Sequence, residues 1–256
     1  MHWQLPGALR SLSVRVFANM YSINIDEAEK PLKEYLSIGD FFVRRLKPSV
    51  RPLAAARVVN PADAVVNAAG SITDGKMLQV KHRPYSVAQI LTSPQRAKDL
   101  EGGFFATYYL CPTDYHRVHS PVSGKITSVD HVPGKLWPVY KKSVEGIADL
   151  FAVNERMVVS IETDLGLVSV VFVGAMNVGK IELAFDSHFQ SQMPDIDEKR
   201  SKNYTPPIAI KAGDELGLFR MGSTVVVFYP KSYSQEISLS RLQALVGQAT
   251  KVRAAL

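Results

Sequence analysis

Apolar residues near the start of the chain recur at steps of three and four, the spacing of one face of an α-helix. The members of this stripe are Leu5, Leu9, Leu12, Val16 and Met20. Phe17 lies beside the stripe, and Arg10 and Arg15 lie off its centre. A basic amphipathic helix of this kind can lie in a membrane interface, or it can pack on the protein's own core. The pattern leaves both alternatives open.

A second helical stretch is predicted from residue 26 to about residue 45, interrupted by Ser37-Ile38-Gly39-Asp40. The two prolines of Lys47-Pro48-Ser49-Val50-Arg51-Pro52 then break the pattern. We therefore expect a helical N-terminal arm, residues 1–52, followed by a body, residues 53–256.

The body shows short β-type runs separated by Gly, Pro, Asn and Asp, a pattern typical of an antiparallel sandwich or barrel. The runs cover residues 58–59, 65–66, 104–110, 124–132, 157–161, 167–173, 180–185 and 225–229. Helical signal is confined to residues 86–91 and 94–100, and the charged stretch 191–207 is predicted to be a long exposed loop. The expected fold class is α+β, with a β-rich catalytic body and a helical, membrane-associating arm.

Charge narrows the choice of partner. Among 256 residues, Lys and Arg number 30 against 24 Asp and Glu, so the formal net charge is +6. This excess favours an anionic partner, either nucleic acid or an acidic membrane surface. The sequence has no Gly-rich phosphate loop and no basic-aromatic pattern of an RNA-binding sheet, so nucleic acid is not expected.

Targeting signals favour peripheral attachment. There is no run of about 20 apolar residues, which excludes a predicted transmembrane helix. Arg10 and Arg15 interrupt the N-terminal apolar segment, unlike the core of a secretory signal. The single cysteine, Cys111, cannot form an internal disulfide and fits a reducing compartment.

Two histidines, His116 and His119, lie three residues apart. That spacing can serve a metal on a helix, but the segment follows a β-type run and no Cys or Glu cluster supplies further ligands, so no metal is predicted. A histidine can instead activate a serine as a base, with a carboxylate to orient the ring. Asp63 is one candidate for that carboxylate, and a turn or cap role is its alternative.

Gly222-Ser223-Thr224 precedes the β-branched run 225–229 and is by itself compatible with a simple turn. In combination with Pro61-Ala62-Asp63 and Asp114-Tyr115-His116-Arg117-Val118-His119, it resembles the phosphatidylserine decarboxylase family. Supporting segments are Phe41-Phe42-Val43-Arg44, Asn154-Glu155-Arg156 and Gly174-Ala175-Met176-Asn177-Val178-Gly179. The resemblance extends from about residue 36 to residue 230.

This resemblance implies a proenzyme that cuts itself between Gly222 and Ser223, giving a β chain (1–222) and an α chain (223–256). Ser223 would become a covalent pyruvoyl group, which forms a Schiff base with the substrate amine and acts as an electron sink. His119 would take the serine proton, and Asp63 would hold the His119 tautomer. His116 matches a histidine near the decarboxylation step.

The implied activity is decarboxylation of phosphatidylserine to phosphatidylethanolamine, by a peripheral enzyme on the cytoplasmic face of the cell membrane. A monomer and a homo-oligomer both stay open. A serine hydrolase that uses Ser223, His119 and Asp63 without self-cleavage is the alternative. Two positions depart from the family pattern. Ala64 follows Asp63 where Gly is common, which would matter if that position required a positive φ, and Met221 stands where Leu is frequent.

Overall fold

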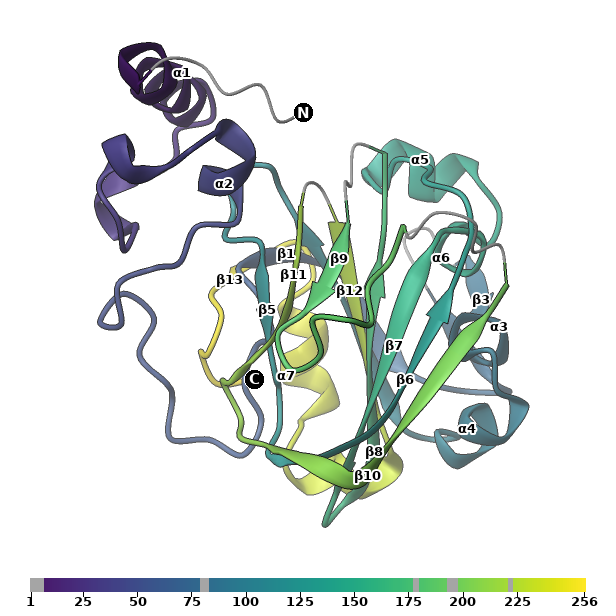
Figure 1. The fold of residues 1–256 in the computed structure, drawn as a ribbon. Coiled ribbons are helices and arrows are strands. Elements are labelled where there is room, and N and C mark those ends of the chain that lie inside the picture. Colours follow the sequence, from purple (N-terminus) through teal and green to yellow (C-terminus); the bar gives the residue numbers. More distant parts are fainter. Residues whose placement is uncertain (1–6, 79–82, 177–179, 193–197, 221–222) are drawn as a thin grey trace.

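The body of the protein is built on one antiparallel sheet (Figure 1). The computed structural model describes residues 7–78, 83–176, 180–192, 198–220 and 223–256. Within these residues the sheet has eight strands, in the order β10-β6-β7-β8-β12-β4-β1-β13. Their bounds, in that order, are Arg200–Ile210, Gly124–Val132, Arg156–Thr163, Gly166–Val173, Ser223–Tyr229, Phe104–Leu110, Ala64–Ser71 and Ala249–Thr250. The outer strands β10 and β13 do not pair with each other in this part of the chain, so the sheet is open.

The centre of the sheet explains the β-branched run near the C-terminus. β12 lies between β8 and β4, and Val225, Val226, Val227 and Phe228 are fully buried. A strand buried on both faces reads as a continuous apolar run rather than as an alternation. The strand predicted at residues 225–229 is confirmed, and it is the central element of the core.

One prediction for the body is wrong. Residues 200–207 were expected to lie in a long loop, but they belong to β10, which pairs with β6 along one edge of the sheet. Most β10 side chains are exposed, which accounts for the low apolar content. The register shifts between Asn203 and Ile208, around Pro206 and Pro207, and an outer strand tolerates such residues because one of its edges needs no donor. Residues 193–197 of the predicted loop lie outside the described residues.

A second, three-stranded sheet packs on the first. It has the order β5-β11-β9, with bounds Arg117–His119, Glu215–Phe219 and Ile181–Leu183. The rings of Phe172 in β8 and Phe219 in β11 lie 5.3 Å apart, so the small sheet covers the β8 region of the large one. The expected α+β class, with an antiparallel β-rich body and an N-terminal helix, is confirmed.

The remaining elements are short. They are the β2–β3 hairpin (Lys76–Leu78 and Pro84–Ser86), α3 (Val87–Leu91), α4 (Pro94–Asp99), α5 (Lys141–Gly146), α6 (Leu150–Val153), η4 (Lys231–Gln235) and α7 (Leu239–Ala244). α3 and α4 confirm the two helical segments predicted in the body, and both begin at a serine N-cap, Ser86 and Ser93. In Figure 1 they lie on the opposite side of the body from the arm.

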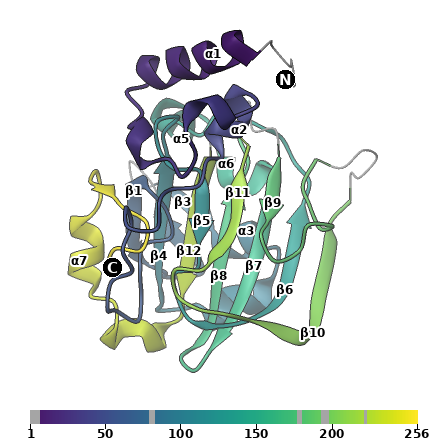
Figure 2. The same ribbon diagram turned by 60° about the vertical axis from the view of Figure 1, so that its left-hand side comes forward.

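The arm has a small core of its own. α1 (Gly7–Met20) crosses above the ends of the strands in Figure 2, with α2 (Ile38–Phe42) beneath it. The core residues are Val14, Ala18, Ile23, Ala28, Tyr35 and Phe41. The second helical stretch, predicted over residues 26–45, is instead broken into η1 (Ile25–Glu27), η2 (Leu32–Glu34) and α2. The breaks have local causes: Ala28 and Pro31 are extended, and the Ser37 hydroxyl caps α2.

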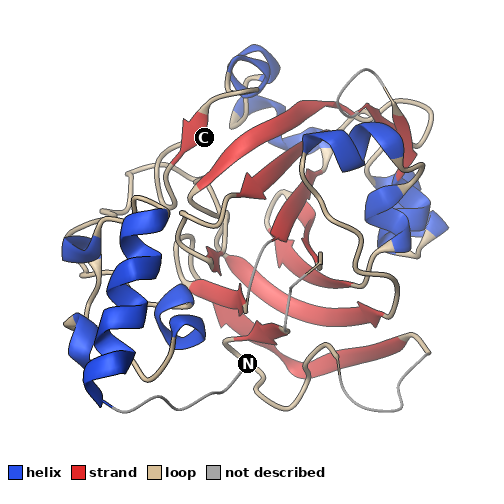
Figure 3. Cartoon of the chain, turned by 90° about the horizontal axis from the view of Figure 1, so that it is seen from above, coloured by secondary structure: helices blue, strands red, loops and turns tan. Residues whose placement is uncertain are grey.

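The arm also packs on the body. In Figure 3, seen from above, the helices of the arm lie beside the strands. Phe42 and Val43 form a buried cluster with Leu218 of β11. The Arg117 Nε group donates to the Val43 carbonyl at 2.9 Å. These contacts fix the end of α2 against the small sheet, whereas the domain boundary after residue 52 stays a prediction.

Candidate active site

Several inner strands of the large sheet begin or stop at the same end of the sheet. The register places Thr224 opposite both Tyr109 and Val173, and Val65 is also opposite Tyr109. The Ser223 backbone is therefore paired with Leu110, and Asp63 immediately precedes β1 on the other side of β4. With strands about 4.8 Å apart, the Asp63 and Ser223 backbones are about 10 Å apart. The sheet thus brings two of the predicted site residues, Asp63 and Ser223, to the same end of its strands. Gly222 and Met221 lie outside the described residues.

The segment that carries both histidines starts from this end of the sheet, directly after β4. After Leu110 the chain makes a tight turn, in which the Asp114 carboxylate accepts from the Cys111 backbone N–H at 2.8 Å. The chain then enters β5, and the Phe219 N–H donates to the His116 carbonyl at 3.0 Å. Since β11 leads toward Ser223, the pairing of β5 with β11 holds both histidines beside the segment that precedes Ser223.

His119 has partners on both ring nitrogens. Nδ1 lies 2.7 Å from the Gly213 carbonyl oxygen, and Nε2 lies 3.1 Å from the Tyr115 hydroxyl. A carbonyl only accepts, so Nδ1 carries the proton and the Nε2 lone pair accepts from Tyr115. Burial lowers the pKa of His119, because the imidazolium form is poorly solvated there. The ring is therefore neutral near pH 7, with the lone pair that a general base requires.

Asp63 is held by a different set of groups. It is 2% exposed, and its carboxylate accepts from Arg51 Nη2 at 2.6 Å and from the Val252 N–H at 2.8 Å. Lys251 Nζ lies 3.5 Å away, and Arg51 also pairs with Glu27 of the arm at 2.9 Å. The described residues include no hydrogen bond between Asp63 and His119. The His119 tautomer, predicted to be held by Asp63, is instead set in this structure by Gly213.

His116 lies in dry surroundings. It is fully buried, and its ring lies 4.0 Å from the Phe42 ring, centroid to centroid. Nδ1 is 2.9 Å from the Asp114 carbonyl oxygen and therefore carries the proton. Nε2 is buried and has no hydrogen-bond partner in the part of the chain that the structure describes. Burial lowers the pKa of His116 to about 3, so the ring is neutral at physiological pH and presents an unused acceptor.

A polar groove of about 330 Å³ leads to the His119 side of the site. Tyr115 and His119 line it together with Arg51 and Arg253, among other residues. Arg253 Nε donates to the same Gly213 carbonyl that orients His119, at 3.0 Å. The base is therefore reachable from solvent, and its orienting carbonyl is fixed by a second donor.

Ala64, which departs from the family pattern, is accommodated without a positive φ. It is the first residue of β1 and pairs with Thr250, whose hydroxyl donates to the Ala64 carbonyl at 3.2 Å. Extended backbone suits alanine as well as glycine, so this departure leaves the position of Asp63 intact.

The described residues include no group of three or more His, Cys, Asp or Glu side chains that could hold a metal ion. The Nδ1 atoms of the two histidines donate to separate carbonyls, that of Asp114 for His116 and that of Gly213 for His119. The chemistry that the described residues offer is therefore that of two neutral imidazoles and a buried, paired carboxylate.

Sequence reasoning missed four residues of this site: Arg44, Arg51, Tyr115 and Gly213. Arg44 and Tyr115 lie within segments that carried the family resemblance, yet their side chains were given no role. Gly213 and Arg51 had no signal, because the contacts that matter join Gly213 to His119 and Arg51 to Asp63 across the fold.

Comparison with known proteins agrees with the resemblance. A profile of the phosphatidylserine decarboxylase family matches residues 38–255. The chain is 38% identical to the phosphatidylserine decarboxylase proenzyme of Anaeromyxobacter sp., over 98% of this chain and 87% of that protein. It is 41% identical to the proenzyme of Saccharophagus degradans (87% and 79%) and 37% identical to that of Myxococcus xanthus (96% and 90%). The chain therefore belongs to the phosphatidylserine decarboxylase family.

Proposed function

We propose that the chain is a proenzyme that cuts itself between Gly222 and Ser223, and that the mature protein converts phosphatidylserine to phosphatidylethanolamine and CO₂. The observation that carries the proposal is the strand register at one end of the large sheet. It pairs Ser223 with Leu110, and the segment that follows Leu110 holds two neutral histidines. The names of the proenzymes to which the chain is similar support the same substrate.

In the proposed cleavage, the Ser223 Oγ attacks the Gly222 carbonyl carbon as the C–N bond breaks, which gives an ester and a free amine. His119 Nε2 takes the hydroxyl proton, once its hydrogen bond from the Tyr115 hydroxyl is exchanged for one from Ser223. Loss of the Ser223 α-proton then expels the Gly222 carboxylate and leaves dehydroalanine. Water adds, ammonia leaves and a ketone remains, so one water is consumed and one ammonia released.

Asp63 is assigned to this maturation step through its charge and position. Its carboxylate is fixed by Arg51 and by the Val252 backbone N–H. Pro61, two residues before Asp63, accepts a hydrogen bond from the His119 backbone N–H at 2.8 Å. A carboxylate that comes near the ring during maturation would favour the imidazolium that forms when His119 accepts a proton.

The two resulting chains are expected to stay together. β12 would belong to the α chain, yet it is hydrogen-bonded on both sides to strands of the β chain, β4 and β8. Its side chains Val225 to Phe228 are fully buried in the common core. The Val252 N–H to Asp63 bond adds a polar link between the two chains.

For the decarboxylation, the ketone would accept the electrons of the breaking C–C bond. The residues around its position fit such a group, because the neighbouring His116 has a buried Nε2 that no protein group uses. His116 Nδ1–H is fixed on the Asp114 carbonyl, so Nε2 can accept a proton from the substrate or orient an N–H of it. The Phe42 ring excludes water from one face of the imidazole.

The test is the intact mass of denatured protein. We expect two chains, the smaller starting at residue 223 with a ketone in place of its amine. Ser223→Ala should remain a single chain, because no oxygen nucleophile is left, while Ser240→Ala, an exposed serine of the same segment, should cleave normally. An active protein that remains one chain and is blocked by serine-directed reagents would favour the serine hydrolase instead.

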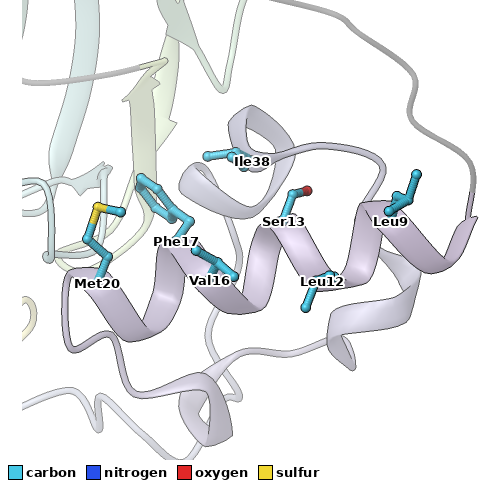
Figure 4. Close-up of a pocket in the computed structure, with 7 residues that line it drawn as sticks. All are labelled: Leu9, Leu12, Ser13, Val16, Phe17, Met20 and Ile38. Atoms are coloured by element: carbon cyan, nitrogen blue, oxygen red, sulfur yellow. The ribbon is translucent and has the colours of Figure 1, made fainter.

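Membrane attachment is proposed to be peripheral and to use the outer face of α1. Leu9, Leu12, Val16 and Met20 are 50–71% exposed, whereas Val14 and Ala18 face the arm's own core. Figure 4 shows the exposed side chains following one another along α1, with Ile38 of α2 beside them. Among the described residues, no helix is both long and apolar enough to span a membrane. Since the stripe is not used by the fold, we assign it to the surface of the bilayer, on the cytoplasmic side that the unpaired Cys111 favours.

The test of this contact is the double variant Leu9→Glu and Leu12→Glu, examined by flotation with anionic vesicles and by thermal unfolding. Flotation should be lost and the melting temperature should not change, because both side chains are already exposed. Asn19→Glu, on an exposed polar position of the same helix, is the control for added charge. Retained flotation with a lowered melting temperature would place the membrane contact elsewhere.

A further inference from the structure

Arg44 is buried without the partners that its charge requires. The residue is 5% exposed, and its Nη2 group approaches the Thr113 and Asp114 carbonyl oxygens at 3.3 and 3.5 Å. Nε and Nη1 are buried and have no hydrogen-bond partner among the described residues. A guanidinium has five N–H donors, and leaving several of them unpaired away from water is costly. Among the described residues no acceptor fills this place, so Arg44 has donors free for a group that is not part of the described structure.

The neighbouring arginines show the contrast. Arg45 pairs with Glu215 at 3.3 Å, and Arg51 pairs with both Glu27 and Asp63. No ion pair formed by the described residues includes Arg44. Burial lowers the pKa of Arg44, and nearby carboxylates act in the opposite direction, but a guanidinium in a protein remains protonated.

Arg44 and His116 are anchored to the same oxygen. The Asp114 carbonyl accepts from His116 Nδ1 at 2.9 Å and is approached by Arg44 Nη2. Consecutive phenylalanines support the pair, because Arg44 lies 5.1 Å from the Phe41 ring centroid and His116 stacks on Phe42. Unused cationic donors therefore lie beside an unused neutral acceptor, His116 Nε2.

This pair lies between the proposed membrane surface and Ser223. Ile38, at the start of α2, contributes to the apolar surface formed with α1, and Phe42, at its end, contacts His116. With a rise of about 1.5 Å per residue, these two positions are about 6 Å apart along the helix. The turn whose carbonyls hold Arg44 begins directly after Leu110, the partner of Ser223 in the sheet. A lipid headgroup entering beside α2 would meet Arg44.

We propose that Arg44 is the residue that binds the phosphodiester of the substrate headgroup, through its Nε–H and Nη1–H groups. This assignment rests on the proposed function. Phosphate is chosen over the serine carboxylate because a cation on the carboxylate would stabilise the charge that decarboxylation removes, and would favour the ground state over the transition state. A cation on the phosphate, whose charge is unchanged by the reaction, contributes binding without that penalty.

The experiment compares Arg44→Gln with the parent and with Arg57→Gln, which removes an exposed arginine far from the site. Intact mass should show that all three proteins are cleaved. KM for phosphatidylserine should rise about 10- to 100-fold in Arg44→Gln alone, the effect of losing charge-assisted hydrogen bonds, with kcat changed much less. Calorimetry on the cleaved proteins, with glycerol 3-phosphate as the probe, should show a loss of affinity of the same size.

Three soluble inhibitors identify the atom that is bound. Glycerophosphoserine and glycerophosphoethanolamine share the phosphate, and L-serine has the carboxylate alone. Arg44→Gln should weaken inhibition by both phosphodiesters and leave that by L-serine unchanged. Weakening confined to glycerophosphoserine and L-serine would overturn the phosphate assignment, because glycerophosphoethanolamine has no carboxylate.

Other outcomes also decide the matter. Unchanged KM and probe affinity in Arg44→Gln, or a folded variant that no longer cleaves, would overturn the binding role. If Arg44→Gln does not fold, Arg44→Lys keeps the charge without the planar fork and should bind the probe about 10-fold more weakly. Affinity equal to that of the parent would contradict the proposal. A parent protein that remains uncut or releases no CO₂ refutes the proposed function instead, while probe binding still tests Arg44.

Discussion

The two histidines of the site are three residues apart, yet they lie in opposite surroundings. His119 has a partner on each ring nitrogen and opens onto a polar groove. His116 is sealed between Phe42 and the turn after β4, and one of its nitrogens has no partner. In both rings a backbone carbonyl fixes the proton on Nδ1, so the tautomer is the same and only the environment of Nε2 differs.

This difference indicates that the two histidines serve different steps, His119 self-cleavage and His116 turnover of the substrate. The His119 region is complete within the chain itself, as a base needs to be when its only substrate is a neighbouring serine. In the His116 region, donors of Arg44 and the Nε2 acceptor of the ring have no partner among the described residues, as a region that binds a substrate would need. The polar region would then serve the single maturation event, and the dry region would serve repeated turnover.

Removing each histidine in turn should have the largest effect and is the strongest test of this comparison. His119→Ala should slow self-cleavage by about 10²–10⁴-fold, the contribution of a general base, whereas His116→Ala should cleave like the parent and turn over poorly. The measurements are the intact mass over time and CO₂ release by the cleaved protein. Equal cleavage by both variants, or normal turnover by cleaved His116→Ala, would show that this assignment of steps is wrong.

Removing a cation tests whether the polar region depends on its ion pairs. Arg51→Met leaves the buried Asp63 with only Lys251 at 3.5 Å and one backbone donor, and should lower the free energy of unfolding by about 3–5 kcal/mol. The double variant with Asp63→Asn should recover part of this loss, since the buried carboxylate charge is then removed as well. Urea unfolding in an uncleavable Ser223→Ala background measures both.

The control for Arg51→Met is Arg57→Met, which breaks an exposed ion pair with Asp164. Such surface pairs contribute about 0–1 kcal/mol. If Arg51→Met costs no more than this control, the Glu27–Arg51–Asp63 contacts do not hold the site together.

Much of the body could be predicted from local pattern alone. The strands at residues 104–110 and 124–132 were predicted with the observed bounds. The first is an almost continuous apolar run, as expected for a buried central strand, and the second is bounded by the turn residues Gly124 and Pro133. The outer strand β10 could not be recognised, since its side chains remain exposed and its ladder is formed on one side only. The predicted helix over residues 26–45 failed for a different reason. Local backbone features break the helix, because Ala28 and Pro31 are extended and the Ser37 hydroxyl caps a new helix.

The candidate site residues were chosen by residue type and family resemblance, and their roles stay predictions, whereas their contacts could not be predicted. The positions of Ser223, His116, His119 and Asp63 followed from motifs, whereas their partners are set by backbone atoms and arginines distant in the sequence. A glycine carbonyl leaves no trace in a side-chain pattern, so Gly213 could not be identified as the group that orients His119. For the same reason Asp63 was given a partner that it does not have in this structure.

Titration sharpens the contrast at His116. Its pKa is lowered to about 3 in the folded chain and is near 6.5 when unfolded, so the unfolded state binds a proton first as the pH falls. Stability should therefore decrease below about pH 6.5, by up to about 1.4 kcal/mol per pH unit for this group. Between about pH 6.5 and 5, the Ser223→Ala protein should lose about 2 kcal/mol more than the same protein with His116→Gln. Equal pH dependence in the two proteins, measured by urea unfolding, would mean that His116 is not the dry group described here.

The smallest expected effect concerns the carbonyl that orients His119. Gly213 has a φ of +83°, and a Cβ there would lie 2.7 Å from Leu53 Cδ1. Gly213→Ala should cost about 1–2 kcal/mol in stability for the left-handed backbone, and should slow self-cleavage about 10-fold because the shifted carbonyl holds Nδ1–H less well. Gly75→Ala is the matched control, since Gly75 has a φ of +65° and nothing within 4 Å of the added Cβ. The control should lose similar stability and cleave at the parent rate. If both variants cleave like the parent, the Gly213 carbonyl is not what prepares His119, and the completeness of the polar region would have to come from Tyr115 or Asp63 instead.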